Sequence, residues 1–237
     1  MLTGYGLVAE GSLNIGDHRI ELESIENGRV YRRIYRGEVK AELLISGVEK
    51  IVLTPIYPVM VPKFFTQYIL LELKESLVIA PGSHIVIYTF VPVDLAVYVY
   101  RSEMYRIVDA FSINKIKYTL YGPIEQGVVA RYWRTELLRQ ESYPGLGKAL
   151  TRLVVVNKTR EWARLSKILL DSSPLKLYYR RGSWEAYTQE LSLTIDTPST
   201  ASIVYGKPFV EDAVAIDDPP ELKPPRITNR TDMLWGI

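Results

Sequence analysis

The chain contains no cysteine, and only two of its 237 residues are histidines. The absence of thiols excludes disulfides, thiolate catalysis and iron–sulfur ligation. Two histidines without cysteine, His18 and His84, do not supply the ligands of a conventional zinc or copper site. We therefore predict no metal site and no cofactor.

The motifs of common catalytic centres are also missing. No glycine-rich loop leads from a predicted strand into a helix, so a nucleotide-phosphate cradle is absent. Neither histidine has a neighbouring Gly-x-Ser-x-Gly motif. Paired carboxylates of the glycosidase type depend on a separation in space that a sequence does not give. The candidates are Asp94, Asp109, Glu125, Glu136 and Glu141, and ordinary surface acids are the simpler interpretation. We predict no catalytic residue and favour a protein that is not an enzyme.

A large excess of charge of either sign is lacking as well. The chain has 29 lysines and arginines against 27 aspartates and glutamates, a net charge of +2, so no strong field draws it to nucleic acid or anionic lipid. The run Arg29–Gly37 (RVYRRIYRG) interleaves arginine with tyrosine, as a nucleic-acid surface does. Its acidic flanks favour an edge strand with a solvated face instead. We expect no nucleic-acid partner.

Long hydrophobic runs are absent too. The closest, Ile85–Tyr100, is shorter than the ~20 residues of a membrane span and is interrupted by Pro92 and Asp94. The first residues lack the basic region and apolar core of a signal peptide. We expect no membrane span and a cytoplasmic location. The 17 tyrosines against 5 phenylalanines, with no cysteine, hint at a thermophilic source.

What the chain does contain is alternation of apolar and polar residues, interrupted by turns such as Asn27-Gly28. This pattern predicts a mostly β protein with two tandem antiparallel β-sandwich-like modules and a Pro-rich, extended C-terminal segment. The first module spans 1–142, and the polar stretch before Lys148 is its boundary. The second, Ig-like module spans 149–237 and includes an extended tail over 206–237. Acidic pairs in that tail offer oxygen ligands to a divalent cation, but solvation of the tail is the simpler interpretation.

One segment fits two structures. In Arg160–Asp171, a stripe of Trp162, Leu165, Ile168 and Leu169 fits a helix, whereas strict alternation fits a strand. We predict a strand, because both neighbouring segments are predicted strands.

The central stretch 117–134 (KYTLYGPIEQGVVARYWR) predicts two strands joined by a turn at Gly122-Pro123. Aromatic residues and arginine are typical of protein interfaces. We therefore predict a non-enzymatic interaction or assembly module, whose partner is an unknown protein or a second copy. Burial of Trp133 in the core is the competing interpretation. The predicted surface consists of Tyr121, Arg131, Tyr132, Trp133, Arg134 and the terminal Trp235.

A second function is a carbohydrate- or small-ligand-binding sandwich. Trp162, Trp184, Tyr178 and Tyr179 would form its stacking face. It requires at least two of these rings to be exposed and coplanar. A hydrolase that uses paired carboxylates is a further alternative.

Several runs together resemble an archaeal family of uncharacterised proteins, domain of unknown function 432. The runs are SLVIAPGS with VPVDLAVYV, then YTLYGPIEQGVVARYW, LVVVNKTREWARLSKILL, LKLYY and the terminal MLWGI. The resemblance spans nearly the whole chain and depends on the order and spacing of these runs. It implies an archaeal, intracellular protein of mostly β structure, and it assigns no catalytic or binding residue.

Overall fold

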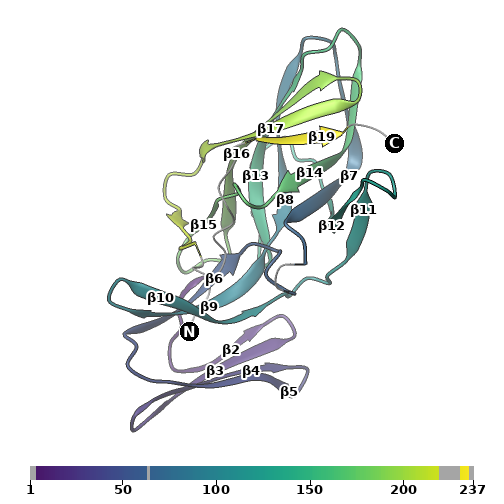
Figure 1. Ribbon diagram of the computed structural model, residues 1–237. Coiled ribbons are helices and arrows are strands. Elements are labelled where there is room, and N and C mark those ends of the chain that lie inside the picture. The colour runs from purple at the N-terminus through teal and green to yellow at the C-terminus, as the bar shows by residue number, and fades with distance from the viewer. Residues whose placement is uncertain (1–3, 63–64, 219–229, 235–237) are drawn as a thin grey trace.

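The structure, a computed structural model, describes residues 4–62, 65–218 and 230–234, the last of these as backbone only. All helical or extended segments assigned in these residues are β-strands, which confirms the all-β prediction. No helix among the described residues is able to cross a membrane. The strands form four sheets, which we call A to D (Figure 1).

Sheets A and B form the lower part of the molecule in Figure 1. Sheet A has the strand order β1 (Gly6–Leu7), β6 (Lys50–Ile56), β9 (Asp94–Arg101) and β10 (Met104–Phe111). Sheet B is an antiparallel meander of β2 (Gly11–Ile15), β3 (His18–Ile25), β4 (Gly28–Tyr35) and β5 (Glu38–Ile45).

Sheets C and D form the upper part. Sheet C has the order β11 (Tyr118–Tyr121), β12 (Val128–Thr135), β7 (Tyr68–Ile79) and β14 (Ala163–Asp171). Sheet D has the order β18 (Val214–Ala215), β15 (Leu177–Tyr179), β16 (Ala186–Thr197), β13 (Lys148–Asn157) and β8 (His84–Pro92). Beside β16, sheet D also contains β17 (Thr200–Pro208), which pairs with β19 (Arg230–Leu234).

Polar contacts tie the sheets in two pairs. The Tyr31 hydroxyl of sheet B donates to Asp109 of sheet A at 2.7 Å. The Thr89 hydroxyl of sheet D donates to Thr135 of sheet C at 3.1 Å. The chain passes from sheet D to sheet A at Val93, between β8 and β9. The two sheet pairs are therefore connected directly, through the consecutive strands β8 and β9.

Two strand pairings correct the expectation of purely antiparallel sheets. β12 pairs with β7 in parallel, and β13 pairs with β16 in parallel. Parallel pairing needs a long crossover between the strands. The chain supplies one because β8 to β11 intervene before β12, and β14 and β15 intervene before β16.

The sheets do not follow the predicted division of the chain. β7 and β8 lie within residues 1–142, yet they pair with β14 and β13 from the second half. The first and second halves thus share sheets C and D, and β9 and β10 return to the lower pair. The two modules are consequently not arranged in tandem along the chain.

Three local predictions are confirmed. Residues 163–171 form a strand, β14, as alternation indicated. β11 and β12 pair as a hairpin with Tyr118 opposite Arg131. The Asn27-Gly28 turn joins β3 to β4. Of the predicted tail, residues 206–208, 214–215 and 230–234 belong to strands, while 219–229 and 235–237 lie outside the described residues.

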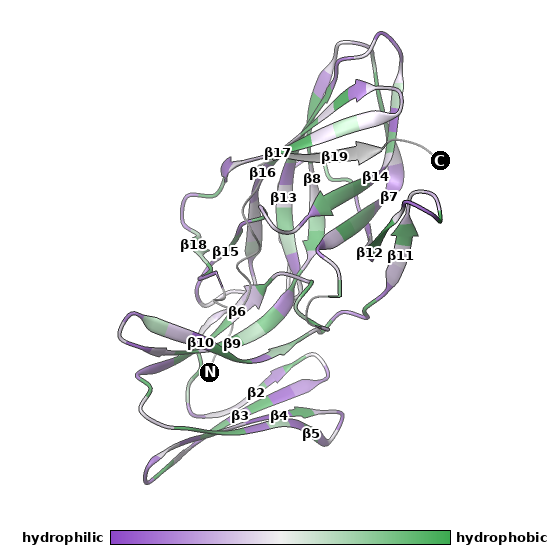
Figure 2. Ribbon diagram, in the orientation of Figure 1, coloured by the Kyte–Doolittle hydropathy of each residue, from purple (hydrophilic) through white to green (hydrophobic). Residues whose placement is uncertain are grey.

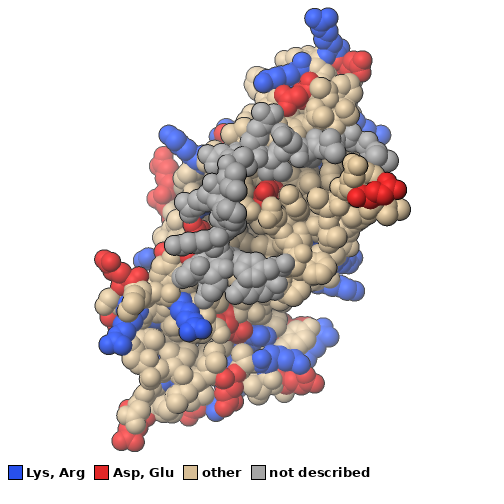
Figure 3. Space-filling model, in the orientation of Figure 1, with Lys and Arg blue, Asp and Glu red and all other residues tan. Residues whose placement is uncertain are grey.

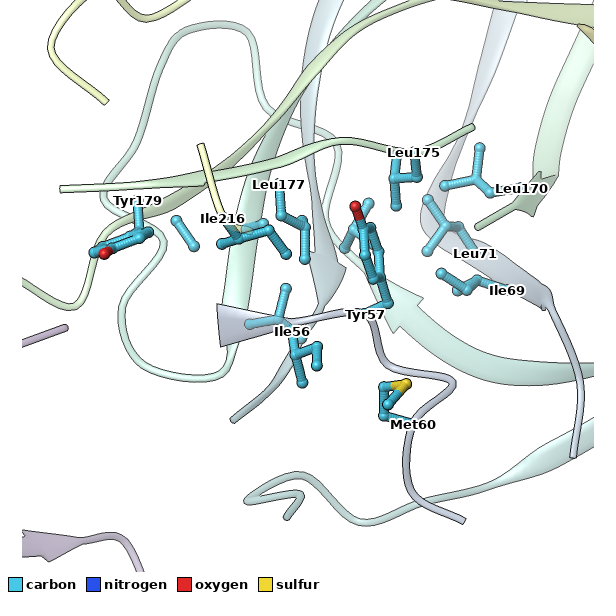
Figure 4. Packing of buried hydrophobic residues seen from close by; sticks show 14 of the residues in the cluster. Ile56, Tyr57, Met60, Ile69, Leu71, Leu170, Leu175, Leu177, Tyr179 and Ile216 are labelled. Carbon is cyan, nitrogen blue, oxygen red and sulfur yellow. The ribbon is translucent and has the colours of Figure 1, made fainter. Parts of the chain in front are cut away.

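One connected cluster of buried apolar residues runs through both sheet pairs. Figure 2 shows hydrophobic residues along the central strands and hydrophilic ones at the outer loops. At the junction of the pairs, Ile56, Tyr57 and Met60 belong to the same cluster as Leu177 and Ile216 (Figure 4). The junction is therefore packed from segments that are distant in sequence.

Candidate functional site

The predicted interaction surface on the central hairpin is split between the two faces of β12. Alternation places Tyr132 and Arg134 on one face and Arg131 and Trp133 on the other. Arg134 is exposed, Tyr132 and Trp133 are half-buried, and Arg131 is only 2% exposed. Tyr121 is half-buried on β11, and Trp235 lies outside the described residues. Arg131 therefore belongs to the interior and to no surface.

Arg131 forms a buried, two-pronged ion pair with Asp94. Its guanidinium nitrogens donate to the Asp94 oxygens at 2.7 and 2.8 Å, and one of them also reaches the Ser112 hydroxyl at 3.0 Å. A further bond goes to the Pro58 carbonyl. Burial raises the pKa of the Asp94 carboxyl, and Arg131 opposes that rise. The pair joins β9 of sheet A to β12 of sheet C, so its role is to hold the junction.

The other carboxylate candidates do not converge on a common centre. Asp109 binds Arg33 and Tyr31, Glu136 binds Lys74, and Glu141 accepts a long bond from Tyr88. Glu125 is exposed at the hairpin turn. Within the described ranges, no group of three or more histidines and acids is placed to hold a metal ion.

The four aromatic residues proposed to stack on a sugar are also separated. Trp162, which immediately precedes β14, is 72% exposed. Tyr178 and Tyr179 are consecutive on β15 and so point to opposite faces. Tyr179 and Trp184 both contact the Tyr5 ring edge-on, with centroids 5.9 and 5.1 Å away. These rings do not form one exposed, coplanar face.

A different site lies between sheet A and the edge of sheet D, where a pocket of about 500 Å³ opens. Its floor is one face of β6, because Lys50, Val52 and Thr54 occupy alternate positions and all line the pocket. Tyr100 of β9 stands opposite Lys50 in the strand register and extends this floor. The Lys50 ammonium lies 4.4 Å from the centroid of the Tyr100 ring.

The roof of the pocket comes from β15, β18 and the turn after β15. Its lining residues are Tyr179, Arg181, Gly182 and the segment 214–217. In Figure 4, Tyr179 and Ile216 lie on the same side of the junction, above Ile56. Gly182 donates its amide to the Tyr5 carbonyl at 2.7 Å, which ties the roof to the first strand. A side chain at Gly4 would collide with the Ser183 backbone, so this close approach requires glycine.

Tyrosine hydroxyls fasten the roof segment to the floor. Tyr100 donates to the Asp217 carboxylate at 2.7 Å, and Tyr98 donates to the Asp217 carbonyl at 3.1 Å. Tyr105 donates to the Asp218 carbonyl at 2.9 Å. Burial, followed by the bond to Asp217, raises the pKa of Tyr100, so the phenol remains a donor. These hydrogen bonds hold segment 214–218 against sheet A.

Three polar side chains of the pocket have unused bonding capacity. The Thr54 hydroxyl is buried and has no hydrogen-bond partner among the described residues. Neither Lys50 nor Arg181 lies within 4.0 Å of a carboxylate of the described chain. Buried polar groups are nearly always hydrogen-bonded, and an exception calls for an explanation. The pocket is thus lined by one hydroxyl without a hydrogen-bond partner and by two cations without a carboxylate, and a polar ligand would satisfy these groups.

A model of a protein family matches nearly the whole chain. The family model described as "Protein of unknown function (DUF432)" covers residues 4–233. The chain belongs to the DUF432 family. No curated protein and no solved structure matches it. The site of this DUF432 protein therefore has to be interpreted from its own geometry.

Sequence reasoning missed the two cations and the unpartnered hydroxyl of the DUF432 pocket. Lys50, Thr54 and Arg181 are separated along the chain and belong to no motif. The one signal available was the alternation at Lys50, Val52 and Thr54, which predicts a shared face. The roof that covers this face comes from residues far downstream, so only the three-dimensional arrangement reveals the pocket.

Proposed function

We propose that this DUF432 protein binds a small molecule in the pocket between sheet A and the β15–β18 edge of sheet D. The observation that carries the proposal is the unpartnered, buried hydroxyl of Thr54 on the pocket floor. Small-molecule sites are concave and mostly apolar, enclose roughly 300–1,000 Å³, and contain a few polar groups that fix orientation. The volume of about 500 Å³ and the lining of this pocket agree with that description.

The proposal is for binding without catalysis. The pocket contains one carboxylate, Asp217, whose side chain accepts the Tyr100 hydroxyl. No histidine or serine is among the described residues that line it. A general acid–base pair or an activated nucleophile would need such groups within hydrogen-bond reach of each other.

A variant that fills the pocket tests the proposal. Ala215 is exposed and lines the pocket, so Ala215→Trp blocks the space at little cost in stability. The assay is the thermal unfolding midpoint of the wild type and the variant across a library of small metabolite-like compounds. A ligand at 100 times its Kd stabilises by about 2.7 kcal/mol, which is roughly 5–10 °C for a chain of this size. We expect compounds that stabilise the wild type and leave Ala215→Trp unchanged.

The matched control is Leu44→Trp, which adds the same ring to an exposed position of β5, away from the pocket. It should respond to ligands as the wild type does. The proposal is wrong if no compound stabilises the wild type, or if stabilising compounds act equally on Ala215→Trp.

A second candidate is the interaction or assembly module, supported by exposed apolar residues around the central hairpin. Leu120 and Val129 are each 42% exposed, and Ile124 is 89% exposed at the turn. Phe65, 57% exposed, lies against Tyr118 with ring centroids 4.5 Å apart. Contiguous exposed apolar residues often mark contact surfaces. Light scattering on the wild type and on Ile124→Asp tests this candidate, which fails if both are strict monomers at high concentration.

A further inference from the structure

The charges that line the pocket indicate what kind of molecule it accepts. Among the described residues of the lining, two are cations, Lys50 and Arg181, and one is a carboxylate, Asp217. The Asp217 carboxylate already accepts the Tyr100 hydroxyl. Neither cation has a carboxylate within 4.0 Å in the part of the chain that the structure describes. The site therefore has an excess of one positive charge and two groups that can donate to anionic oxygens.

Each of the two cations interacts with a tyrosine. The Lys50 ammonium lies over the Tyr100 ring, an arrangement that stabilises a cation without neutralising its charge. Arg181 lies beside Tyr179 and opposes the burial that raises the pKa of that phenol. Figure 3 shows lysines, arginines and acids interspersed over the visible face, without a single-sign patch. The unpaired charge is thus a local property of the pocket.

The floor sets the spacing between its two polar residues. Lys50 and Thr54 are four residues apart on β6, and a strand rises about 3.3 Å per residue, so their Cα atoms are roughly 13 Å apart. Val52 lies between them on the same face, and Ile216 and Ala215 contribute from the roof. The surface between the two polar ends is therefore apolar.

We infer that the ligand is an elongated organic anion, a carboxylate or a phosphate ester. Its anionic oxygens bind Lys50 and Arg181, its apolar or aromatic body lies over Val52, and a hydroxyl or carbonyl at its other end bonds the Thr54 hydroxyl. This inference rests on the proposed function and specifies the chemical class of the molecule bound.

A matched series of probes with one aromatic body tests the inference by isothermal titration calorimetry. The carboxylate probe is 3-(4-hydroxyphenyl)propanoate, and the phosphate probe is 2-(4-hydroxyphenyl)ethyl phosphate. The neutral probe is 2-(4-hydroxyphenyl)ethanol, and the cationic probe is tyramine. We expect at least one anion to bind about tenfold more tightly than the neutral probe, and tyramine to bind least. The stronger of the two anions identifies the anionic group.

Charge-removing variants locate the anionic end. Lys50→Met and Arg181→Met keep most of the side-chain stem, and each should weaken the anionic probe about tenfold while leaving the neutral probe unchanged. Lys158→Met removes the same charge from an exposed loop after β13 and should change nothing. Thr54→Val should weaken 3-(4-hydroxyphenyl)propanoate several-fold and leave 3-phenylpropanoate, which lacks the hydroxyl, unaffected.

The outcomes separate this inference from the proposed function. Equal affinity for the anionic and neutral probes, or unchanged affinity in both Lys50→Met and Arg181→Met, overturns the anion class while the pocket remains a binding site. The anion class is also overturned if none of the four probes binds while library compounds stabilise the wild type and not Ala215→Trp. If no compound of any charge is sensitive to Ala215→Trp, both proposals are wrong.

Discussion

The ion pair between Asp94 and Arg131 should dominate the stability of the junction between the two sheet pairs. Asp94 is fully buried, and the Arg131 side chain is 3% exposed. Arg131→Met removes the donors to Asp94, Ser112 and Pro58 and leaves a buried carboxylate without its cation. Breaking one side of a buried pair costs about 3–5 kcal/mol. We expect that loss in the free energy of unfolding, measured by urea denaturation at pH 7.

A double-variant cycle isolates the pair itself. Asp94→Leu with Arg131→Met replaces two buried charges by apolar side chains, which is often close to neutral for such pairs. The double variant should therefore be more stable than either single variant. The exposed pair Lys74–Glu136, with its atoms 2.5 Å apart, is the control, and Lys74→Met should cost under about 1 kcal/mol. The reasoning would be refuted if Asp94→Leu and Arg131→Met each lowered the free energy of unfolding by less than about 1 kcal/mol and if the double variant showed the sum of the two losses.

Three further predictions follow from buried polar groups. Asn157→Ala should cost about 3 kcal/mol in urea unfolding, because the fully buried amide bonds the carbonyls of Ile79, Ala80 and Glu161; a loss no larger than that of Lys158→Ala would contradict this. Thr54→Val should leave stability unchanged or raise it by up to about 1 kcal/mol, because it removes an unpaired buried hydroxyl, and a clear loss would show a bond that the structure lacks. Burial, aided by Arg33, lowers the pKa of His18 against the opposing effects of Ser112, Asp109 and Asp17. The unfolded chain therefore takes up the proton first, and thermal stability should fall as the pH drops below about 6.5. His18→Gln should weaken this dependence, and exposed His84→Gln should retain it.

Local structure was largely predictable from the sequence because strand periodicity is a local property. Alternation identified β14 correctly, although Trp162 to Leu169 also fits a helical stripe. The Asn27-Gly28 turn and the central hairpin followed from short-range turn chemistry. Which strands pair is decided by long-range packing. β7 pairs in parallel with β12 although β8 to β11 lie between them in the chain, and no pattern in the sequence of either strand predicts this pairing.

The candidate site was beyond sequence reasoning for a related reason. Arg131 stands among aromatic residues, as an interface arginine does, but Asp94 on another sheet neutralises it and takes it into the interior. The pocket joins a floor at residues 50–54 to a roof at residues 179–182 and 214–217. Its evidence is that, among the described residues, Thr54 has no hydrogen-bond partner and Lys50 and Arg181 have no carboxylate nearby, which only the three-dimensional structure reveals.

The most direct test of the binding function is native mass spectrometry of the full chain. Wild type and Ala215→Trp are each incubated with a small-molecule extract of the cells that produce the protein, and unbound material is removed. The wild type should retain a small anionic adduct that collisional activation releases, and Ala215→Trp should carry none. Identical spectra, either both without an adduct or both with the same one, would contradict the assignment of the pocket as a ligand-binding site.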